Sequence, residues 1–350
     1  MPTIPADRLT ETVTRVFAAA GSAEEEAAIV AGHLVEANLR GHDSHGIGLI
    51  ANYLRNLGQG KAKVNEKGRV VSDQGSMIVY DGDRGWGQIV AREATLLGIA
   101  RAKELGVAVV ALRNAHHIGR VGTYGEMCAE AGLVSISFVN ITDQRPAVAP
   151  WRGGDARFGT NPVTVAIPGP SPDRPIIADM ATSRIAMGKV RVARNKGEQI
   201  APGTLLDAEG QPTIDPHVMY RRPRGALLTF AEHKGYALAF ICEILAGAVT
   251  GSGTMRPERQ DAESVTNGML LVIIDPARLA EPDWITDEIR AMTDYVTASP
   301  PRNPGEPVLI PGDPERLMRA RRLAEGVPVD EETWREFAAA ARTVNVLVEG

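Results

Sequence analysis

The sequence predicts an α/β protein whose two chain ends together form a helical domain. Four apolar runs in the middle of the chain are rich in Val and Ile, and each is followed by small or polar residues, as expected of buried strands that end in loops. Both chain ends instead show the apolar spacing of helices that bury one face. With 350 residues the chain is long enough for two or three domains. The four runs span residues 107–112, 133–140, 174–180 and 269–276.

The first hundred residues contain helical patterns and one short strand. The spacing predicts two helices over residues 5–20 and 22–40. The stretch 59–85 is rich in turn residues, and only 77–80 within it has the composition of a strand. A helix over residues 88–105 then leads into the first of the four apolar runs.

The domain division follows from this order of elements. Helical patterns return from residue 286 onward, after the last apolar run. We therefore expect a helical domain made of residues 1–75 together with 285–350. The central α/β region, residues 76–284, is expected to bind cofactor and substrate, because ligand sites in α/β proteins gather just past strand ends.

Composition restricts the partners of this chain. The formal net charge of −5 argues against a large nucleic-acid interface. The two cysteines, Cys128 and Cys242, have no second cysteine at metal-ligand spacing, so buried free thiols and a cytoplasmic location are expected. The N-terminus lacks the apolar segment of a signal peptide. The longest apolar run, 235–251, contains Glu243 and is short for a bilayer span, so it predicts a buried core helix and no membrane partner.

The stretch GHDSHGIG, residues 41–48, places four polar side chains between glycines at the end of the second helix. Three interpretations are open: a metal site, an acid/base site, or a hydrogen-bonded helix cap without chemistry. The glycine spacing partly matches a dinucleotide-binding loop, but such a loop must follow a hydrophobic strand, so a standard Rossmann loop is not expected. The four polar residues are His42, Asp43, Ser44 and His45.

A metal site is the weaker of these interpretations. It would need three or four ligands, and adjacent histidines seldom bind one ion. The chain also lacks the H-E-x-x-H spacing of zinc hydrolases. No metal is therefore expected. The ligands that a metal would have to use are His42, Asp43, His45, His116 and His117.

The acid/base interpretation gains from the segment RNAHHIGRVGTYG, residues 113–125. It places His116 and His117 just past a predicted buried strand. Histidine is the side chain whose unperturbed pKa suits proton exchange near neutral pH. Two histidine-bearing loops flanked by glycines would suit a small polar substrate held between domains. For any one histidine taken alone, a structural role is the default.

Three further polar segments have both a structural and a functional interpretation. The segment 151–169 contains Gly-Thr-Asn-Pro and has the composition of a turn. The segment 179–189, DMATSRIAMGK, could cap a helix that faces a phosphate. In 229–240, Lys234 and Gly235 open an apolar helix and could hold an anion, or simply form a solvated helix start.

Together these segments resemble the malate/L-lactate dehydrogenase family, which is distinct from the Rossmann-type lactate and malate dehydrogenases. The matching motifs run in family order from residue 40 to about residue 315, and no one of them is specific alone. Within the family the motifs are most similar to the hydroxycarboxylate dehydrogenase B type. The motifs are DSHGIG, RNAHHIG, APWRGGDARFGTNP, DMATS with a later GK, EHKGYALA and LIPGDPE.

The resemblance implies fold, reaction and assembly. It implies a non-Rossmann NAD(P)-binding α/β fold with a mixed central sheet, and a homodimer with the active site in a cleft near the interface. The implied reaction is reversible hydride transfer between C4 of nicotinamide and C2 of a 2-oxo or 2-hydroxy acid. The implied cofactor is NAD or NADP, with NAD favoured.

The resemblance also implies site residues. Ser44, His45 and His117 belong to the substrate site, with either histidine available as the proton carrier; we take His117. The cofactor segments fall at Asn140, Thr160, Asn161, Asp179, Met180, Ala181, Thr182, Ser183, Lys234, Gly235, Pro311, Gly312 and Asp313.

One position departs from the family pattern. Many members carry an arginine four residues after the motif histidine, and here that residue is Leu49. A leucine cannot bind a carboxylate as a guanidinium does. The change predicts a bulkier or aromatic substrate side chain, with the carboxylate bound by Arg55, Arg120 or backbone N–H groups.

Three alternatives stay open from the residues. A cyclic-imine reductase of the same family would reduce C=N with the same histidines. A metal-dependent hydrolase would use His42, Asp43, His45 and His117. A non-catalytic dimeric binding protein would need none of this chemistry.

Overall fold

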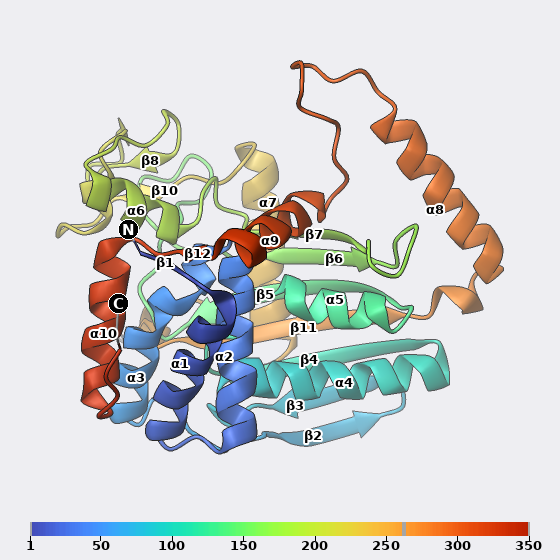
Figure 1. Ribbon diagram of the computed structural model, residues 1–350, viewed down its shortest axis with the longest axis horizontal. Coiled ribbons are helices and arrows are strands. Elements are labelled where there is room, and N and C mark those ends of the chain that lie inside the picture. Colours follow the sequence, from blue (N-terminus) through green and yellow to red (C-terminus); the bar gives the residue numbers. More distant parts are fainter. Residues whose placement is uncertain (1, 261–263, 349–350) are drawn as a thin grey trace.

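The centre of the protein is a seven-stranded sheet (Figure 1). The computed structural model describes residues 2–260 and 264–348. The strand order is β2-β3-β4-β11-β5-β6-β7; β3 and β4 run parallel, and the other neighbouring pairs of this sheet are antiparallel. This confirms the predicted α/β class with a mixed sheet. The strands are β2 (Arg69–Gln74), β3 (Met77–Asp81), β4 (Val107–Ala115), β5 (Val134–Thr142), β6 (Val163–Ile167), β7 (Ile176–Met180) and β11 (Thr266–Ile274).

The four predicted apolar runs form β4, β5, β7 and β11. Strand β11 lies between β4 and β5 although more than a hundred residues separate it from either in sequence. Pairing on both sides buries most of its residues, which explains its continuous apolar composition. Strand β2 was not predicted, because its residues are largely exposed and lack apolar alternation. It places the start of the sheet at Arg69, before the predicted boundary near residue 75.

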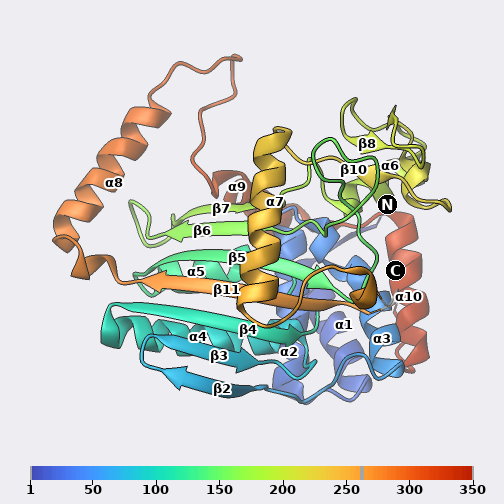
Figure 2. The ribbon, with the colours of Figure 1, turned by 180° about the vertical axis from the view of Figure 1, so that it is seen from behind.

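Helices cover the two faces of the sheet unequally. One face carries α4 (Gly87–Leu105) and α5 (Gly122–Glu130), as Figure 1 shows. The other face is crossed by α7 (His233–Glu243), which continues as a π-helical segment, η4 (Ile244–Val249) (Figure 2). The predicted core helix over 235–251 is buried on its inner side alone. Its outer side exposes Phe240, Ile241 and Val249 by 46%, 46% and 62%.

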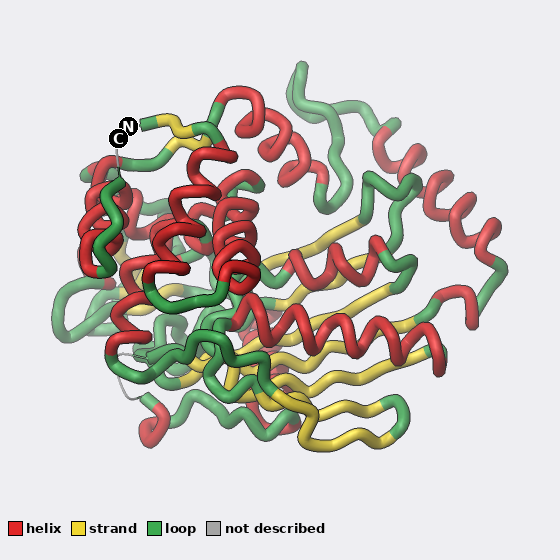
Figure 3. Tube along the Cα trace, turned by 60° about the horizontal axis from the view of Figure 1, so that its bottom comes forward, coloured by secondary structure: helices red, strands yellow, loops and turns green. Residues whose placement is uncertain are grey.

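A helical layer packs beside the end of the sheet, and it unites the two chain termini (Figure 3). Its apolar core includes Phe17, Leu34, Tyr53 and Phe337, which come from four different helices. A two-stranded sheet, β1 (Thr3–Ile4) with β12 (Val327–Pro328), joins the first and last parts of the chain. The helices are α1 (Ala6–Ala19), α2 (Glu24–Leu39), α3 (Ile50–Gly58) and α10 (Glu331–Thr343).

A third, smaller unit was not anticipated from the sequence. A three-stranded sheet of β8 (Leu205–Leu206), β9 (Pro212–Thr213) and β10 (Ala226–Leu227) lies with α6 (Met187–Lys196). Helix α6 lies along the 41–48 loop: Gly188 faces Ser44, and a Cβ there would overlap the serine. One turn later the Arg191 guanidinium reaches Gly48.

Helix α8 (Pro282–Thr297) projects from the body (Figure 1), and of its residues only Thr293 is buried. The chain then returns to α9 (Asp313–Glu325) beside the helical layer. Within the described residues, no helix is long and apolar enough to cross a membrane. Short helical turns are η1 (Asp43–His45), η2 (Ile47–Leu49), η3 (Pro216–Met219), η5 (Pro257–Arg259) and η6 (Pro276–Arg278).

Candidate active site

The 41–48 loop is built around the amide of Asn38, in the last turn of α2. Its Nδ2 donates to Asp43 Oδ1 at 2.6 Å, and its Oδ1 accepts from the Ile47 backbone N–H at 3.0 Å. The amide occupies the space in which a side chain at position 46 would lie, so Gly46 is required there. The loop consists of η1 and η2 and passes directly into α3.

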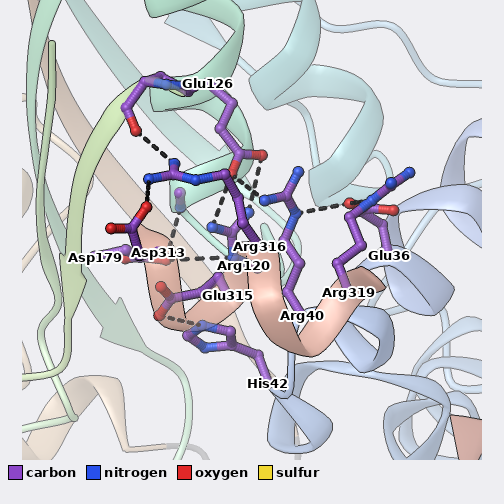
Figure 4. Close-up of polar contacts among 12 residues, drawn as sticks. Glu36, Arg40, His42, Arg120, Glu126, Asp179, Asp313, Glu315, Arg316 and Arg319 are labelled. Atoms are coloured by element: carbon purple, nitrogen blue, oxygen red, sulfur yellow. Dashed lines mark hydrogen bonds and ion pairs between the residues drawn. The ribbon is translucent and has the colours of Figure 1, made fainter. Parts of the chain in front are cut away.

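Two of the four polar residues in this loop are anchors. Both oxygens of Asp43 accept from the guanidinium of Arg322 in α9, at 2.7 and 3.0 Å. The Nε2 atom of His42 lies 3.5 Å from Glu315 Oε1, also in α9 (Figure 4). For His42 and Asp43 the structural interpretation therefore holds.

The other two polar residues face a histidine from the second loop. The rings of His45 and His117 stack with their centroids 5.7 Å apart and their planes 18° apart. Ser44 Oγ lies 3.0 Å from Nδ1 of His45. Segments more than seventy residues apart in sequence therefore place two imidazoles side by side, and both keep some solvent-accessible surface.

Tyr53, on α3, contacts the ring of His117. Gln88 Nε2 donates to Tyr53 Oη at 2.9 Å, and Tyr53 Oη lies 2.7 Å from His117 Nδ1. Because the tyrosine oxygen already accepts from Gln88, its own proton is available to Nδ1. The hydroxyl also lies 3.3 Å from the His117 carbonyl, to which it can donate while its oxygen accepts from Nδ1–H. Tyr53 can therefore hold the ring in either tautomer, with Nε2 on the far side of the ring.

The remaining histidines of the cluster are structural. His116 is buried, accepts from Asn56 Nδ2 at 3.1 Å, and packs edge-on against Tyr53 and Trp86. His33, on α2, accepts the backbone N–H of Arg120 at 2.9 Å through Nε2. A Cβ at Gly119 would overlap the His33 ring, so this glycine permits the close approach of the second loop to α2.

Burial keeps these imidazoles neutral. Desolvation, with a smaller contribution from the charge of His42, lowers the pKa of His45 to about 4. Desolvation also holds the pKa of His117 well below 6.5, with a further contribution from His45. Because the two rings are stacked, protonating one disfavours protonating the other. Both rings are therefore neutral at pH 7.

Arg120 is committed to other protein groups. Its two terminal nitrogens bind Glu126 at 3.0 Å each, Arg40 binds the same carboxylate at 3.0 Å, and the Arg120 side chain is almost fully buried (Figure 4). The guanidinium of Arg55 instead lines a groove of about 950 Å³ between α3 and α10, whose lining includes neither His45 nor His117. Neither arginine is placed to bind a substrate carboxylate beside the imidazoles.

The segments predicted to hold the cofactor meet beside these loops. Thr182 donates through Oγ1 to the carbonyls of Thr160 and Asn161, at 2.9 and 3.1 Å. The backbone N–H of Phe230 donates to Thr182 O at 3.1 Å, which brings the start of α7 with Lys234 to the same place. The segments 160–161, 179–183 and 234–235 thus lie next to one another and together form one region, which we call the cofactor surface.

Asp179 joins this surface to the histidine loops. Its carboxylate accepts from the Gly122 N–H at 2.8 Å and from Thr164 Oγ1 at 2.7 Å. The Ile177 N–H donates to Pro311 O at 3.1 Å, which adds the fourth predicted segment. Next to it, the carboxylate of Asp313 is bound by Arg174 and Arg316, so it already has protein partners.

The chemistry of this surface fits a nicotinamide dinucleotide. Met180 presents an apolar side chain that is 43% exposed, and the Lys234 side chain is exposed near the opening turn of α7. Asn161 Oδ1 is a buried polar atom without a hydrogen-bond partner among the residues that the structure describes. An apolar platform, a cation and a free polar atom are groups that such a molecule requires. Among the described residues, no group of three or more His, Cys, Asp or Glu is arranged to hold a metal ion.

A family model described as malate/L-lactate dehydrogenase matches residues 4–338. The chain belongs to this family. It is 46% identical to hydroxycarboxylate dehydrogenase B of Escherichia coli, over 97% of this chain and 94% of that protein. The family's dehydrogenases use a nicotinamide cofactor, and this protein is an oxidoreductase of 2-hydroxy and 2-oxo acids.

Solved structures of the family share the fold. An E. coli protein assigned only provisionally as a malate/lactate dehydrogenase superposes with a TM-score of 0.95 at 44% identity, over 99% of this chain and 96% of that chain. A Δ1-piperideine-2-carboxylate reductase from Pseudomonas syringae pv. tomato superposes with a TM-score of 0.82 at 30% identity, over 97% of this chain and the whole of that chain. This chain thus shares its mixed-sheet fold with solved members of the family.

Sequence reasoning missed Tyr53, Gln88 and His33. Nothing in the local pattern distinguishes them from ordinary helix residues, because each contacts the histidine loops only after the helical layer packs on the sheet. The one available signal was spacing: Tyr53 follows Leu49 by four residues, which places both on one side of a helix that begins in the motif.

The buried histidines predict acid-sensitive stability. Burial lowers the pKa of His33 and His116 to about 3, whereas an unfolded histidine has a pKa of about 6.5. The unfolded chain then binds more protons between these values, so the free energy of unfolding decreases as pH falls below 6.5. We expect Tm to fall between pH 7 and pH 5, and His33→Gln to reduce that slope.

Differential scanning calorimetry across this range measures the effect. The matched control is His217→Gln, because His217 is exposed and should leave the slope unchanged. A Tm independent of pH between 7 and 5, or an unaltered slope in His33→Gln, would contradict the expectation.

Proposed function

We propose that His117 carries the proton in a reversible hydride transfer between nicotinamide and a 2-oxo or 2-hydroxycarboxylate. The observation that supports this is the stack of His117 and His45, with Tyr53 bound to Nδ1 of His117. When bound, the cofactor donates or accepts the hydride at the carbon that bears the substrate oxygen.

The residues then have separate roles. Hydride arrival at a carbonyl carbon leaves negative charge on the oxygen, and a donor already in position stabilises that charge. In the reduction direction His117, protonated on both nitrogens, gives its Nε2 proton to this oxygen and is left neutral, while its Nδ1–H donates to Tyr53 Oη and holds the ring. His45, with Ser44, orients the substrate oxygen or shares the proton. In the oxidation direction the ring protonated only on Nδ1 accepts the proton at Nε2, and the lowered pKa of His117 keeps the ring neutral before that transfer.

The cofactor is proposed to lie on the surface made by the predicted segments. Asn140, Thr160, Asn161, residues 179–183, Lys234-Gly235 and 311–313 would hold it, with NAD favoured over NADP. The connections among Thr160, Thr182 and the start of α7 support this placement.

The substrate is proposed to be an acid with a bulky or aromatic side chain. Leu49 is half-buried and precedes Tyr53 by one helical turn, where it offers an apolar wall instead of a charge. Because Arg120 is bound by Glu126 and Arg55 lines a separate groove, we assign the carboxylate to backbone N–H groups.

His117→Gln tests the proton carrier. Removing a general acid slows catalysis by roughly 10²–10⁴-fold, so turnover should collapse while NADH still binds. Stopped-flow kinetics measure turnover, and NADH fluorescence titration measures cofactor binding. His42→Gln is the loop control and should retain most of the turnover, because His42 contacts Glu315 instead of His117. Normal turnover in His117→Gln would reject the assignment.

A cyclic-imine reductase is the second candidate, because a structural relative carries that name. The two imidazoles could protonate nitrogen as well as oxygen. Parallel assays of 2-oxo acids and cyclic imino acids, each with NADH and with NADPH, separate the candidates. We expect faster NADH oxidation with an aryl-substituted 2-oxo acid than with pyruvate or an imino acid. Faster turnover of the imino acid would favour the alternative.

We further propose a homodimer that covers the outer side of α7. From Ala237 to Val249 the exposed residues of this side are apolar: Ala237, Phe240, Ile241, Ile244, Ala248 and Val249. A helix apolar on all sides is normally enclosed, and homodimer interfaces are more apolar than other interfaces. The projecting α8 also lacks a covering surface in its own chain, although isolated helices of this length are marginal in water.

Ile244→Asp tests the dimer. A charge in the middle of the apolar stripe should convert the species from a dimer to a 37.4 kDa monomer in sedimentation-velocity runs at micromolar concentration. Leu347→Asp, at an exposed position away from α7, is the control and should leave the mass unchanged. A wild-type protein that sediments as a monomer would contradict the proposal.

A cytoplasmic location is also proposed, with no nucleic-acid or membrane partner. Cys128 and Cys242 are both free and buried, in keeping with a reducing compartment.

A further inference from the structure

Glu243 is a buried carboxylate at the end of an otherwise apolar helix. It is the last residue of α7, with 5% of its surface exposed. Oε1 accepts from Asn140 Nδ2 at 3.1 Å and from the Met255 N–H at 2.6 Å. Oε2 accepts from Asn161 Nδ2 at 2.7 Å. A buried carboxylate is costly unless donors surround it, and here three donors do.

One branch of this cluster leads to the His117 loop. Asn140 O accepts from Asn267 Nδ2 at 2.8 Å, and Asn267 Oδ1 accepts from the Ile118 N–H at 3.0 Å. Ile118 directly follows His117. All of these side chains are buried, so water does not compete for the bonds. Glu243 is therefore joined to the backbone beside His117 through two asparagines.

The other branch leads to the predicted cofactor surface. Asn161 has a φ of 34°, an unfavourable backbone conformation for a residue other than glycine. Its Nδ2 is held by Glu243, and its carbonyl accepts from Thr182 Oγ1. The carboxylate thus helps to hold a strained turn against the 179–183 segment.

Glycines leave room for this arrangement. A Cβ at Gly247 would collide with Asn140 Nδ2, and one at Gly268 would collide with Asn140 Oδ1. Because a carboxylate only accepts hydrogen bonds, it also fixes both asparagine amides with their nitrogens toward α7.

We propose that Glu243 is a positioning residue that holds the His117 loop and the Asn161 turn in the relative position that hydride transfer requires. This rests on the proposed roles of His117 and of the 160–161 and 179–183 segments.

Glu243→Gln is the first test. Glutamine has the same shape as glutamate, but one of its two terminal atoms is an NH2 group that donates instead of accepting. At least one of the three N–H groups that now donate to Glu243 therefore loses its acceptor. Loss of such a bond corresponds to roughly a 10-fold effect. We expect kcat to fall by about that factor, and amide hydrogen exchange of 116–121 and 159–162 to accelerate in the cofactor-free protein.

Glu26→Gln is the matched control. Glu26 is a buried carboxylate of α2 that accepts from Ser22 Oγ and from the Asn65 N–H, away from this cluster. Glu26→Gln should lower Tm without changing kcat or the hydrogen exchange of 116–121 and 159–162. The control therefore distinguishes a loss of stability from a loss of positioning.

A milder variant covers the case in which Glu243→Gln does not fold. Asn267→Ser interrupts only the branch to Ile118, so exchange should accelerate in 116–121 and stay unchanged in 159–162. Unchanged exchange and kcat in Glu243→Gln, or no segment-specific change in Asn267→Ser, would overturn the proposal. A wild-type protein that turns over no acid would instead refute the proposed function, and the exchange data would still decide the role of Glu243.

Discussion

The hydrogen bond between Tyr53 and His117 joins the two halves of the molecule, and the site depends on it. Tyr53 belongs to the apolar core of the helical layer, where it stacks on Trp86, whereas His117 belongs to the loop after β4. The bond therefore exists only when the helical layer is packed against the sheet. Its dry surroundings make the bond stronger than it would be in water and also make protonation of the ring unfavourable. Catalytic geometry and proton affinity are set by the same packing.

Ion pairs keep this packing in one orientation. Arg322 ties the 41–48 loop to α9, while Arg120 and Arg40 share Glu126 between the second loop, α2 and α5. Buried pairs of this kind contribute little net stability compared with apolar contacts, but an unpaired member is strongly disfavoured. They therefore penalise any arrangement in which the loops slide relative to one another. The arginines beside the two histidine loops are thus bound by carboxylates of the protein itself.

Two helices, α7 and α8, leave apolar side chains exposed. Among the residues that the structure describes, no element covers the outer stripe of α7 or the projecting α8, and both carry exposed apolar side chains. The α7 run has the composition of a core helix although only one of its sides packs on the sheet. The proposed second chain would bury the other side, and a residue buried by a second chain follows the same preference as one buried by its own chain.

The sequence by itself determined the strands β4, β5, β7 and β11, most of the helices, and the order of the motif loops, because these depend on local periodicity and on residue types at strand ends. It also identified His45 and His117 as a candidate pair. The residue types alone did not separate this pair from His42 and His116; the resemblance to the family did, and the structural reason, that His42 and His116 bind other side chains, lies in their three-dimensional contacts. Tyr53, the anchoring of Asp43 by Arg322, and the engagement of Arg120 by Glu126 were decided by tertiary structure. Each joins segments that are distant in the chain, and hydrogen-bond partners, desolvation and ring stacking arise only when those segments meet.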